Sequence, residues 1–383
     1  MKRYILIVAA VAIAAVSCSK TYDVKHVKAS EIGFGVWAEN LTRAARDAGS
    51  STFTADGKQD NDFAVYGYKA MNDKSDSSTV FNDVEVTTTN GTSWTYTTPR
   101  FWDSNFDRYI FFAISPASVG TEADGTNSST DVNPLTGAFV TRSITFEGDN
   151  LDSDVLVADK KQVNKGSSPY FGNFATVPLV FNHVAALVDF NVKKASSLHD
   201  ATVTVSDFEL SQIYTTGALT VTAAYTGTHP VASWSDGSKG TYGPADGVIP
   251  VDISSPIEIS EDTGFSASNT TPGTTPADST YLIRSLVVKP QTFGATGVAT
   301  SQQLSITYSI AVAGGGSNEY TNTLYLADFD LIDNDAQAAT FVGGWQPGKH
   351  YSFHITIDAH KIDFSASITD WAAVQRGYHY LVN

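Results

Sequence analysis

Short runs of alternating apolar and polar residues, separated by clusters of small polar residues, glycine and proline, constrain the fold of this chain most. Residues 84–88 and 94–97 flank Asn90-Gly91, a dipeptide typical of a tight hairpin turn. Residues 108–115 are apolar on both faces, which predicts a central strand that ends at Pro116. No segment beyond the amino-terminal leader carries a helical period. The pattern therefore predicts an all-β fold, with strands at the spacing typical of sandwiches.

The length of the chain favours two domains, because 383 residues are enough for two hydrophobic cores. A polar stretch at residues 159–173 is the best candidate boundary, so we place the change of domain near Asn173. The apolar run at residues 177–192 is too long for one straight strand, which predicts a bulge or bend near Asn182-His183. The expected segments are a leader at residues 1–18, a tether with a first strand at 19–46, an N-terminal domain at 47–173, and a C-terminal domain with its tail at 174–383.

Acidic residues outnumber basic ones. The chain has 40 Asp and Glu against 24 Lys and Arg, a formal charge of −16, so its field repels nucleic acid and anionic lipid headgroups. The sequence lacks the motifs of zinc proteases, serine hydrolases, phosphate-binding loops and dinucleotide-binding folds. We therefore expect no catalytic residue, no metal, no cofactor and no nucleic-acid partner, and we do not expect an enzyme.

The amino terminus has the pattern of a secretion signal. Lys2 and Arg3 precede an apolar run at residues 4–16, which is too short to remain as a membrane-spanning helix. Cys18 follows directly after a small residue and is the only cysteine in the chain, so no intramolecular disulfide can form. The segment resembles a bacterial lipoprotein box, which implies lipidation of Cys18. The alternative is an ordinary signal peptide that is cut nearby and leaves a free thiol.

A strand is expected directly after a polar tether. Its apolar side chains share one face by the period of two, and Gly33 and Gly35 occupy the other face. The apolar face consists of Ile32, Phe34, Val36 and Ala38. A small, polar segment with Arg43 and Arg46 follows, which suggests a cleavable break. Loss of the strand would uncover an apolar groove and unpaired strand edges, a template for the addition of another strand. We therefore interpret the first strand as removable.

Three clusters could suggest a ligand, and for each a structural interpretation is favoured. His350, His354 and His360 lie close together near the end of the chain, but the carboxylate spacing and the turn that would close a metal site are missing. Residues 148–154 are rich in Asp and Asn but lack the glycine and distal glutamate of a calcium loop. Trp345 could present a surface for sugar stacking, but a tryptophan beside a Pro-Gly turn more often packs on the end of a sandwich. We expect half-buried histidines, a solvated turn and a packed indole.

Several motifs together resemble the Bacteroidales fimbrillin family. In chain order they are Phe101-Trp102, residues 109–116 (YIFFAISP), residues 181–188 (FNHVAALV), residues 345–353 (WQPGKHYSF) and residues 368–371 (ITDW). Residues 42–44 are also similar to the segment that follows the first strand in that family. The resemblance covers almost all of the chain after the leader. It implies two tandem transthyretin-like β-sandwich domains, export as a lipoprotein, and assembly into a fimbria (pilus) at the cell surface.

The resemblance also implies a mode of assembly. In the polymerising subunits of the family an arginine-specific protease cuts after the first strand, and a strand from the C-terminal region of a neighbouring subunit fills the groove. The matching cleavage site is Arg43 or Arg46. The tail alternates as such a donor strand should, although Arg376 interrupts its apolar row, and its twelve residues reach roughly 40 Å. The candidate donor residues are Val374, Tyr378, Tyr380 and Val382. Alternatively, the tail completes its own domain.

Two functional hypotheses remain open on the sequence. The first is a structural fimbrial subunit that supports adhesion. Its expected partners are other fimbrial subunits, an arginine-specific protease, the outer-membrane lipid anchor of the precursor and a candidate ligand on a host or bacterial surface. The alternative is a fimbrial tip or accessory adhesin, or an uncleaved surface lipoprotein, which binds a host ligand or glycan through loops such as residues 120–133. The triplet Asp278-Ser279-Thr280 resembles a bacterial O-glycosylation sequence, so Ser279 or Thr280 is a candidate modification site.

Overall fold

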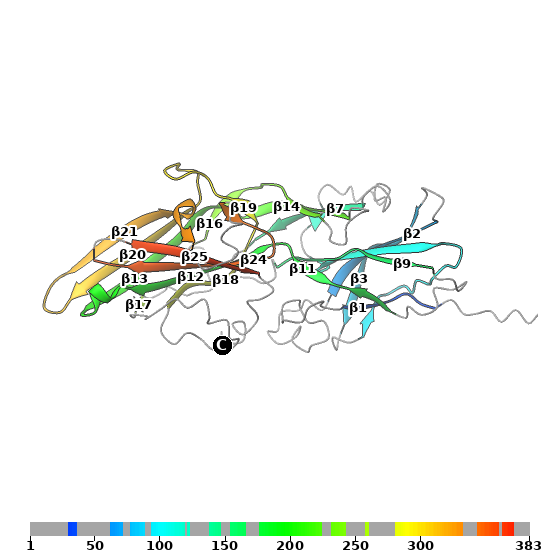
Figure 1. Cartoon of the computed structure of the whole chain (residues 1–383), viewed down its shortest axis with the longest axis horizontal. Helices are drawn as coiled ribbons and strands as arrows, with labels where there is room; N and C mark the ends of the chain where they lie inside the picture. Colours follow the sequence, from blue (N-terminus) through cyan, green and yellow to red (C-terminus); the bar gives the residue numbers. More distant parts are fainter. Residues whose placement is uncertain are drawn as a thin grey trace, which may run out of the picture.

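The computed structural model of the protein is elongated, with one group of sheets at each end of its long axis (Figure 1). The residues that it describes are 30–36, 62–71, 77–88, 93–118, 121–122, 138–146, 154–165, 176–223, 231–242, 257–259, 280–331, 343–359 and 362–370. Within these residues the chain forms β-strands and two short 3₁₀ helices, η4 (Ser196–Leu198) and η6 (Leu326–Asp328). Neither of these helices is long and apolar enough to cross a membrane. The prediction of an all-β fold is confirmed.

A seven-stranded sheet organises the amino-terminal group. Its main path runs β11-β8-β5-β2-β3-β4, and β9 pairs with β5 beside that path. The strands are β2 (Asp62–Ala70), β3 (Ser77–Thr88), β4 (Trp94–Thr95), β5 (Arg108–Ser115), β8 (Leu156–Ala158), β9 (Lys161–Asn164) and β11 (Phe181–His183). Every residue of β5 is buried, and β3 pairs antiparallel with β4, the strand that follows it in the chain. Asn90 and Gly91 themselves lie outside the described residues. The expected central strand and the expected hairpin are therefore both confirmed.

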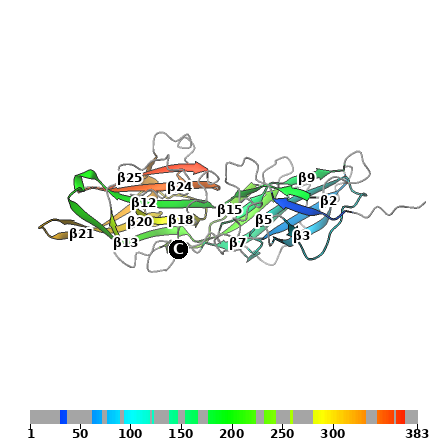
Figure 2. The ribbon, with the colours of Figure 1, turned by 90° about the horizontal axis from the view of Figure 1, so that it is seen from below.

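Both faces of this sheet are covered. One face packs on a four-stranded sheet of order β15-β14-β7-β6, and Tyr66 and Phe112 share a cluster there with Ile144 and Leu219. The strands of that sheet are β6 (Thr121–Glu122), β7 (Ala138–Thr145), β14 (Thr216–Ala223) and β15 (Val231–Trp234). The other face packs on a parallel pair of strands, β1 (Gly33–Val36) and β10 (Thr176–Leu179). In Figure 2 the dark-blue arrow of β1 lies across the front of this end of the molecule.

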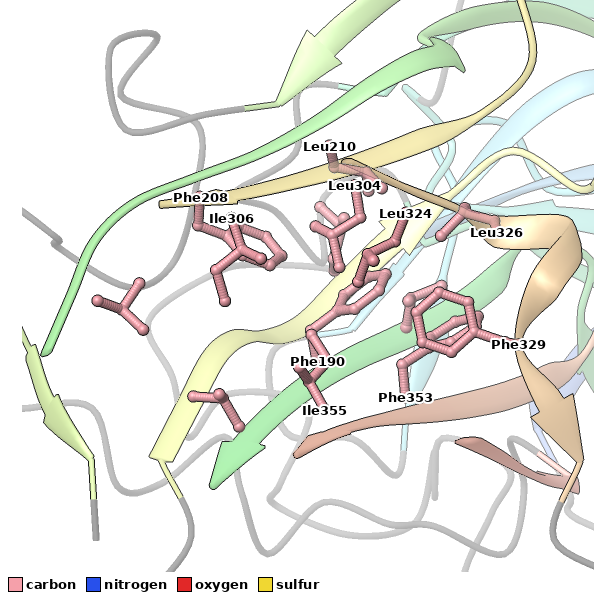
Figure 3. Packing of buried hydrophobic residues seen from close by; sticks show 14 of the residues in the cluster. Phe190, Phe208, Leu210, Leu304, Ile306, Leu324, Leu326, Phe329, Phe353 and Ile355 are labelled. Carbon is pink, nitrogen blue, oxygen red and sulfur yellow. The ribbon is translucent and has the colours of Figure 1, made fainter. Parts of the chain in front are cut away.

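The carboxy-terminal group consists of two five-stranded sheets around a second core. One sheet has the order β18-β12-β24-β25-β22, and the other has β16-β13-β20-β21 with β17 paired to β13. Phe190 stacks on Phe353 at 4.6 Å between ring centroids and lies 5.6 Å from Phe208 of the opposite sheet (Figure 3). The strands are β12 (Ala186–Lys194), β13 (Ala201–Tyr214), β16 (Lys239–Tyr242), β17 (Ile257–Ile259), β18 (Thr280–Val288), β20 (Gln303–Val312), β21 (Ser317–Tyr325), β22 (Asp330–Leu331), β24 (Lys349–Ile357) and β25 (Ile362–Asp370). Two short strands, β19 (Gln291–Thr292) and β23 (Gly344–Trp345), pair separately.

The long apolar run at residues 177–192 is divided among three strands. Its residues belong to β10, β11 and β12, and a break between β11 and β12 directly follows His183. The predicted bend is therefore confirmed. Strands on both sides of Asn173 pair with each other, because β14 joins β7 and β11 joins β8. The boundary near Asn173, the number of domains and their transthyretin-like topology stay predictions.

Candidate functional site

The first strand lies between two segments that are distant from it in the sequence. On one side β1 runs parallel to β10, with Phe34 opposite Val177 and Val36 opposite Leu179. On the other side residues 30–32 run antiparallel to residues 100–102: the Ile32 amide donates to the Arg100 carbonyl at 2.8 Å, and the Trp102 amide donates to the Ser30 carbonyl at 3.1 Å. The backbone of β1 is thus held by β10, and the residues just before it are held by residues 100–102.

The side chains of the first strand fill the core beneath it. Ile32 is fully buried and Phe34 is 4% exposed, whereas Gly33 and Gly35 are half-buried on the opposite face. The Phe34 ring makes edge contacts with Phe63, Phe81, Tyr96 and Phe111 at centroid distances of 6.2, 5.2, 6.0 and 5.8 Å. Such aromatic pairs add to the hydrophobic gain of burial. Phe34 is therefore the main anchor of the first strand.

Tyr96 connects the first strand to its antiparallel neighbour. Its hydroxyl donates to the Ile32 carbonyl at 2.7 Å and accepts from the Arg100 amide at 3.2 Å. Burial raises the pKa of Tyr96 above its usual range, although the Arg100 backbone bond opposes this. The phenol is consequently protonated at neutral pH and can act as the donor that the Ile32 carbonyl needs.

The described part of the chain contains some of the residues predicted for this site. Ile32 and Phe34 lie as expected, with the apolar face turned inward, and Val36 belongs to β1. The remaining predicted residues lie outside the described residues: Ala38, Cys18, Arg43, Arg46, Val374, Tyr378, Tyr380 and Val382. Ser279 also lies outside them, and Thr280 begins β18. Their roles stay predictions.

Sequence reasoning missed three components of the site. β10 was expected only as the beginning of a long strand, Tyr96 only as part of a hairpin, and residues 100–102 only as part of a motif. Parallel pairing of β1 with β10 has no local sequence pattern, because the two strands are far apart in the chain. The density of aromatic residues at 94–102 was the available signal, since aromatic residues that contact each other concentrate in cores.

His350 and His354, the described histidines of the cluster near the carboxy terminus, lie within the second core region. His350 Nε2 lies 2.7 Å from Asp189 Oδ2, and both side chains are buried. Burial lowers the pKa of the nearby His354 to about 4. His360 lies outside the described residues. The described ranges contain no group of three metal-binding side chains.

Trp345 is 2% exposed and packs edge-on against Phe293 at 5.2 Å between centroids. The packed interpretation of this tryptophan is therefore confirmed, and the residue presents no exposed ring for sugar stacking.

Residues 148–153 of the Asp-rich segment lie outside the described residues, and Asp154 Oδ1 is 2.9 Å from His183 Nδ1.

The arrangement defines a class of protein: an elongated, all-β chain whose core is completed by a strand near its amino terminus. The model of the fimbrillin-like family matches residues 42–371, which is most of the chain, so the protein belongs to the fimbrillin-like family. This confirms the family resemblance seen in the sequence.

The solved structures that match this chain include two fimbrial proteins. A fimbrial protein from Bacteroides vulgatus is 17% identical, with a TM-score of 0.48 over 89% of this chain and 99% of that chain. The tip fimbrial protein Mfa3 from Porphyromonas gingivalis is 12% identical, with a TM-score of 0.34 over 86% of this chain and 97% of that chain. The comparison with curated proteins gave no match. Because these identities and TM-scores are low, the assignment depends on the family model.

Proposed function

We propose that this protein is a structural subunit of a cell-surface fimbria, activated by proteolysis and polymerised by exchange of a donor strand. Family membership supports the fimbrial role. The observation that carries the mechanism is the position of Phe34, which belongs to a short strand but is buried among four aromatic rings of the core. A strand that completes a core from the beginning of the chain can be exchanged for one from another molecule.

The connection between β1 and β2 makes this exchange feasible. Residues 37–61 join the two strands and contain Arg43 and Arg46, the candidate cleavage sites. After a cut there, only non-covalent contacts hold the first strand. Burial of one large apolar side chain contributes about 1.5–3 kcal/mol, so Ile32 and Phe34 retain the strand until a longer donor displaces it.

Departure of the first strand would leave a groove with the properties of a donor site. Among the described strands, β10 pairs only with β1, so the edge of β10 that now pairs with β1 would lose its partner. The cluster that contains Phe63, Phe81 and Phe111 would lose its cover. Exposed edges and an apolar floor together favour the addition of an alternating strand.

The tail at residues 372–383 is the proposed donor. It follows β25, which ends at Asp370, and its apolar face comprises Val374, Tyr378, Tyr380 and Val382. In this proposal these side chains occupy the positions that Ile32 and Phe34 hold in the precursor. Lipidation of Cys18 would keep the precursor at the outer membrane until cleavage releases it, and the assembled fimbria supports adhesion.

The test of cleavage uses the purified precursor and an arginine-specific protease, with intact-mass measurement and native sizing. We expect one cut after Arg43 or Arg46, followed by growth of oligomers. Arg43→Gln and Arg46→Gln identify the site, since only one of them should block both steps. A precursor that resists the protease, or that is cut and stays monomeric, would contradict the proposal and favour an uncleaved surface lipoprotein or a tip adhesin.

The test of the donor uses matched changes on the two faces of the tail. Tyr378→Asp and Tyr380→Asp place a charge on the proposed inward face and should stop oligomer growth after cleavage. His379→Asp places the same charge on the opposite face and should leave growth intact. Equal effects of the changes at residues 378 and 379 would show that the tail does not insert as a strand with this register.

A further inference from the structure

A pocket of about 470 Å³ lies at the edge of the amino-terminal group of sheets. It is formed by side chains of β2 and β3 and by residues 100–101, the segment that pairs with the start of the first strand. The residues that matter for its chemistry are Lys69, Thr79, Asn82, Val84, Arg100 and Phe101. Its volume falls within the range of about 300–1,000 Å³ found for small-molecule sites.

Two residues of the pocket lining each carry a side-chain polar atom that is buried without a hydrogen-bond partner in the described part of the chain. These atoms are the amide oxygen Oδ1 of Asn82 and the guanidinium Nε of Arg100. Buried polar atoms in folded proteins almost always have partners, so an unpaired one in a residue that lines a pocket indicates a side chain that can turn to form a hydrogen bond with a ligand. Asn82 needs a hydroxyl or amide donor, and Arg100 needs an acceptor.

The charge of the pocket favours an anion. Among the described residues its lining contains two cations, Lys69 and Arg100, and no carboxylate, in a chain of net charge −16. The charge of Lys69 is already compensated, because its Nζ lies 2.9 Å from Asp103 and 4.1 Å from the centre of the Phe106 ring. The described residues provide no ion pair for Arg100, whose planar guanidinium binds a carboxylate with two parallel hydrogen bonds.

Phe101 adds an apolar surface beside this cation. Its side chain is 48% exposed, one of the few large apolar side chains exposed in the described residues. The backbone around it is firmly held, since a β-bridge joins Phe101 to Glu31. The backbone of Arg100 is held by hydrogen bonds to the Ile32 amide and the Tyr96 hydroxyl. A fixed aromatic face next to hydrogen-bonding groups is suited to a flat ligand with one apolar and one polar side.

We propose that this pocket binds an acidic saccharide, a sugar ring that carries a carboxylate. Arg100 binds the carboxylate, the amide of Asn82 accepts a hydrogen bond from a ring hydroxyl, and Phe101 stacks on the apolar face of the ring. A neutral sugar leaves Arg100 unpaired, and a simple carboxylate leaves Asn82 and Phe101 unused, so the combination selects this class. The proposal goes beyond fimbrial assembly and does not depend on cleavage or strand exchange.

The test is a calorimetric titration of the intact, uncleaved protein with three sugars. Galacturonic acid represents the uronic acids and N-acetylneuraminic acid represents the sialic acids, the two classes of sugar carboxylate compared. Galactose is the neutral counterpart of galacturonic acid. We expect binding of at least one acid sugar, no measurable binding of galactose, and weakening at high salt. The acid sugar that binds more tightly identifies which of the two classes the pocket recognises.

Three variants locate the binding in this pocket. Arg100→Gln should lower the affinity at least about tenfold, because a charge-assisted pair is lost. Phe101→Ala should lower it several-fold, and its exposed side chain can be removed without disturbing the core. Lys161→Gln makes the same change of charge on β9, outside the pocket lining, and should bind as the unmodified protein does. Thermal unfolding of each variant checks that it is folded.

Three results would overturn the proposal. The first is equal affinity for galactose and galacturonic acid, and the second is unchanged affinity in Arg100→Gln and Phe101→Ala. The third is no binding of either acid sugar at about 10 mM, which is well above a weak dissociation constant of about 1 mM. Binding of an acidic peptide without binding of either acid sugar would likewise assign the pocket to a protein partner and contradict it. Because the protein is uncleaved in this test, the outcome is independent of the fimbrial mechanism.

Discussion

The hydroxyl of Tyr96 donates a hydrogen bond to the carbonyl oxygen of Ile32 at 2.7 Å. It also accepts one from the Arg100 amide at 3.2 Å, so one phenol joins the first strand to the segment that forms the wall of the pocket. The proposed strand exchange and the proposed sugar site therefore share a structural element, although each can be tested alone.

Tyr96→Phe should loosen the first strand. The change removes both hydrogen bonds and keeps the ring, so we expect a loss of about 1 kcal/mol in the free energy of unfolding. Amide hydrogen exchange should become faster at residues 30–36, which measures the opening of the strand. Tyr320→Phe removes an exposed hydroxyl elsewhere and is the control. Unchanged exchange at residues 30–36 would show that the hydroxyl does not hold the strand.

Phe34→Ala should destabilise the precursor strongly. The change removes a ring that is 4% exposed and leaves a cavity among its aromatic neighbours, so we expect a loss of about 3–5 kcal/mol in chemical denaturation. Phe101→Ala makes the same chemical change at a side chain that is 48% exposed and should cost less than about 1 kcal/mol. Similar losses for both variants would contradict the role of Phe34 as the anchor.

Gly67→Ala should destabilise the seven-stranded sheet. A Cβ atom at this position would lie 2.8 Å from the Phe81 ring and 2.9 Å from the Phe111 ring, closer than carbon atoms can approach. We expect a loss of about 1–3 kcal/mol, since the two rings must shift. Gly316→Ala is the control, because a Cβ atom there meets nothing within 4 Å. Thermal unfolding of the two variants compares them directly.

The stability of the protein should fall as the pH falls below about 6.5. Burial is the main cause that lowers the pKa of His354 to about 4 in the folded protein, with Lys193 and His350 adding to the effect and the Asp189 carboxylate opposing it. Its ordinary value is 6.5, so the unfolded chain binds a proton that the folded chain excludes between these values. The destabilisation from His354 is about 3 kcal/mol between pH 7 and pH 4.

Denaturation of a His354→Gln variant at several pH values isolates this contribution, because other groups also titrate in the range. The slope of stability against pH should be shallower in the variant than in the unmodified protein. His199→Gln, which removes an exposed imidazole, is the matched control. Parallel slopes for His354→Gln and the unmodified protein would contradict the effect.

Much of the local structure follows from the sequence alone. The period of two in the first strand correctly placed Ile32 and Phe34 on the buried face, because successive side chains in a strand point in opposite directions. The Asn90-Gly91 signal located the hairpin of β3 and β4, and the uninterrupted apolar run of β5 marked a strand buried on both faces. These patterns depend on neighbours in the chain, and a sequence displays them directly.

Only the tertiary structure decided which distant segments meet. The pairing of β1 with β10, the hydroxyl of Tyr96 at Ile32, and the approach of Asn82 to Arg100 in one pocket have no repeating pattern in the sequence. Nor does the pairing of β14 with β7, which joins the two sides of the boundary expected near Asn173. Each contact forms because the whole chain must cover both faces of one sheet, and the free energy of that burial depends on all of the strands together.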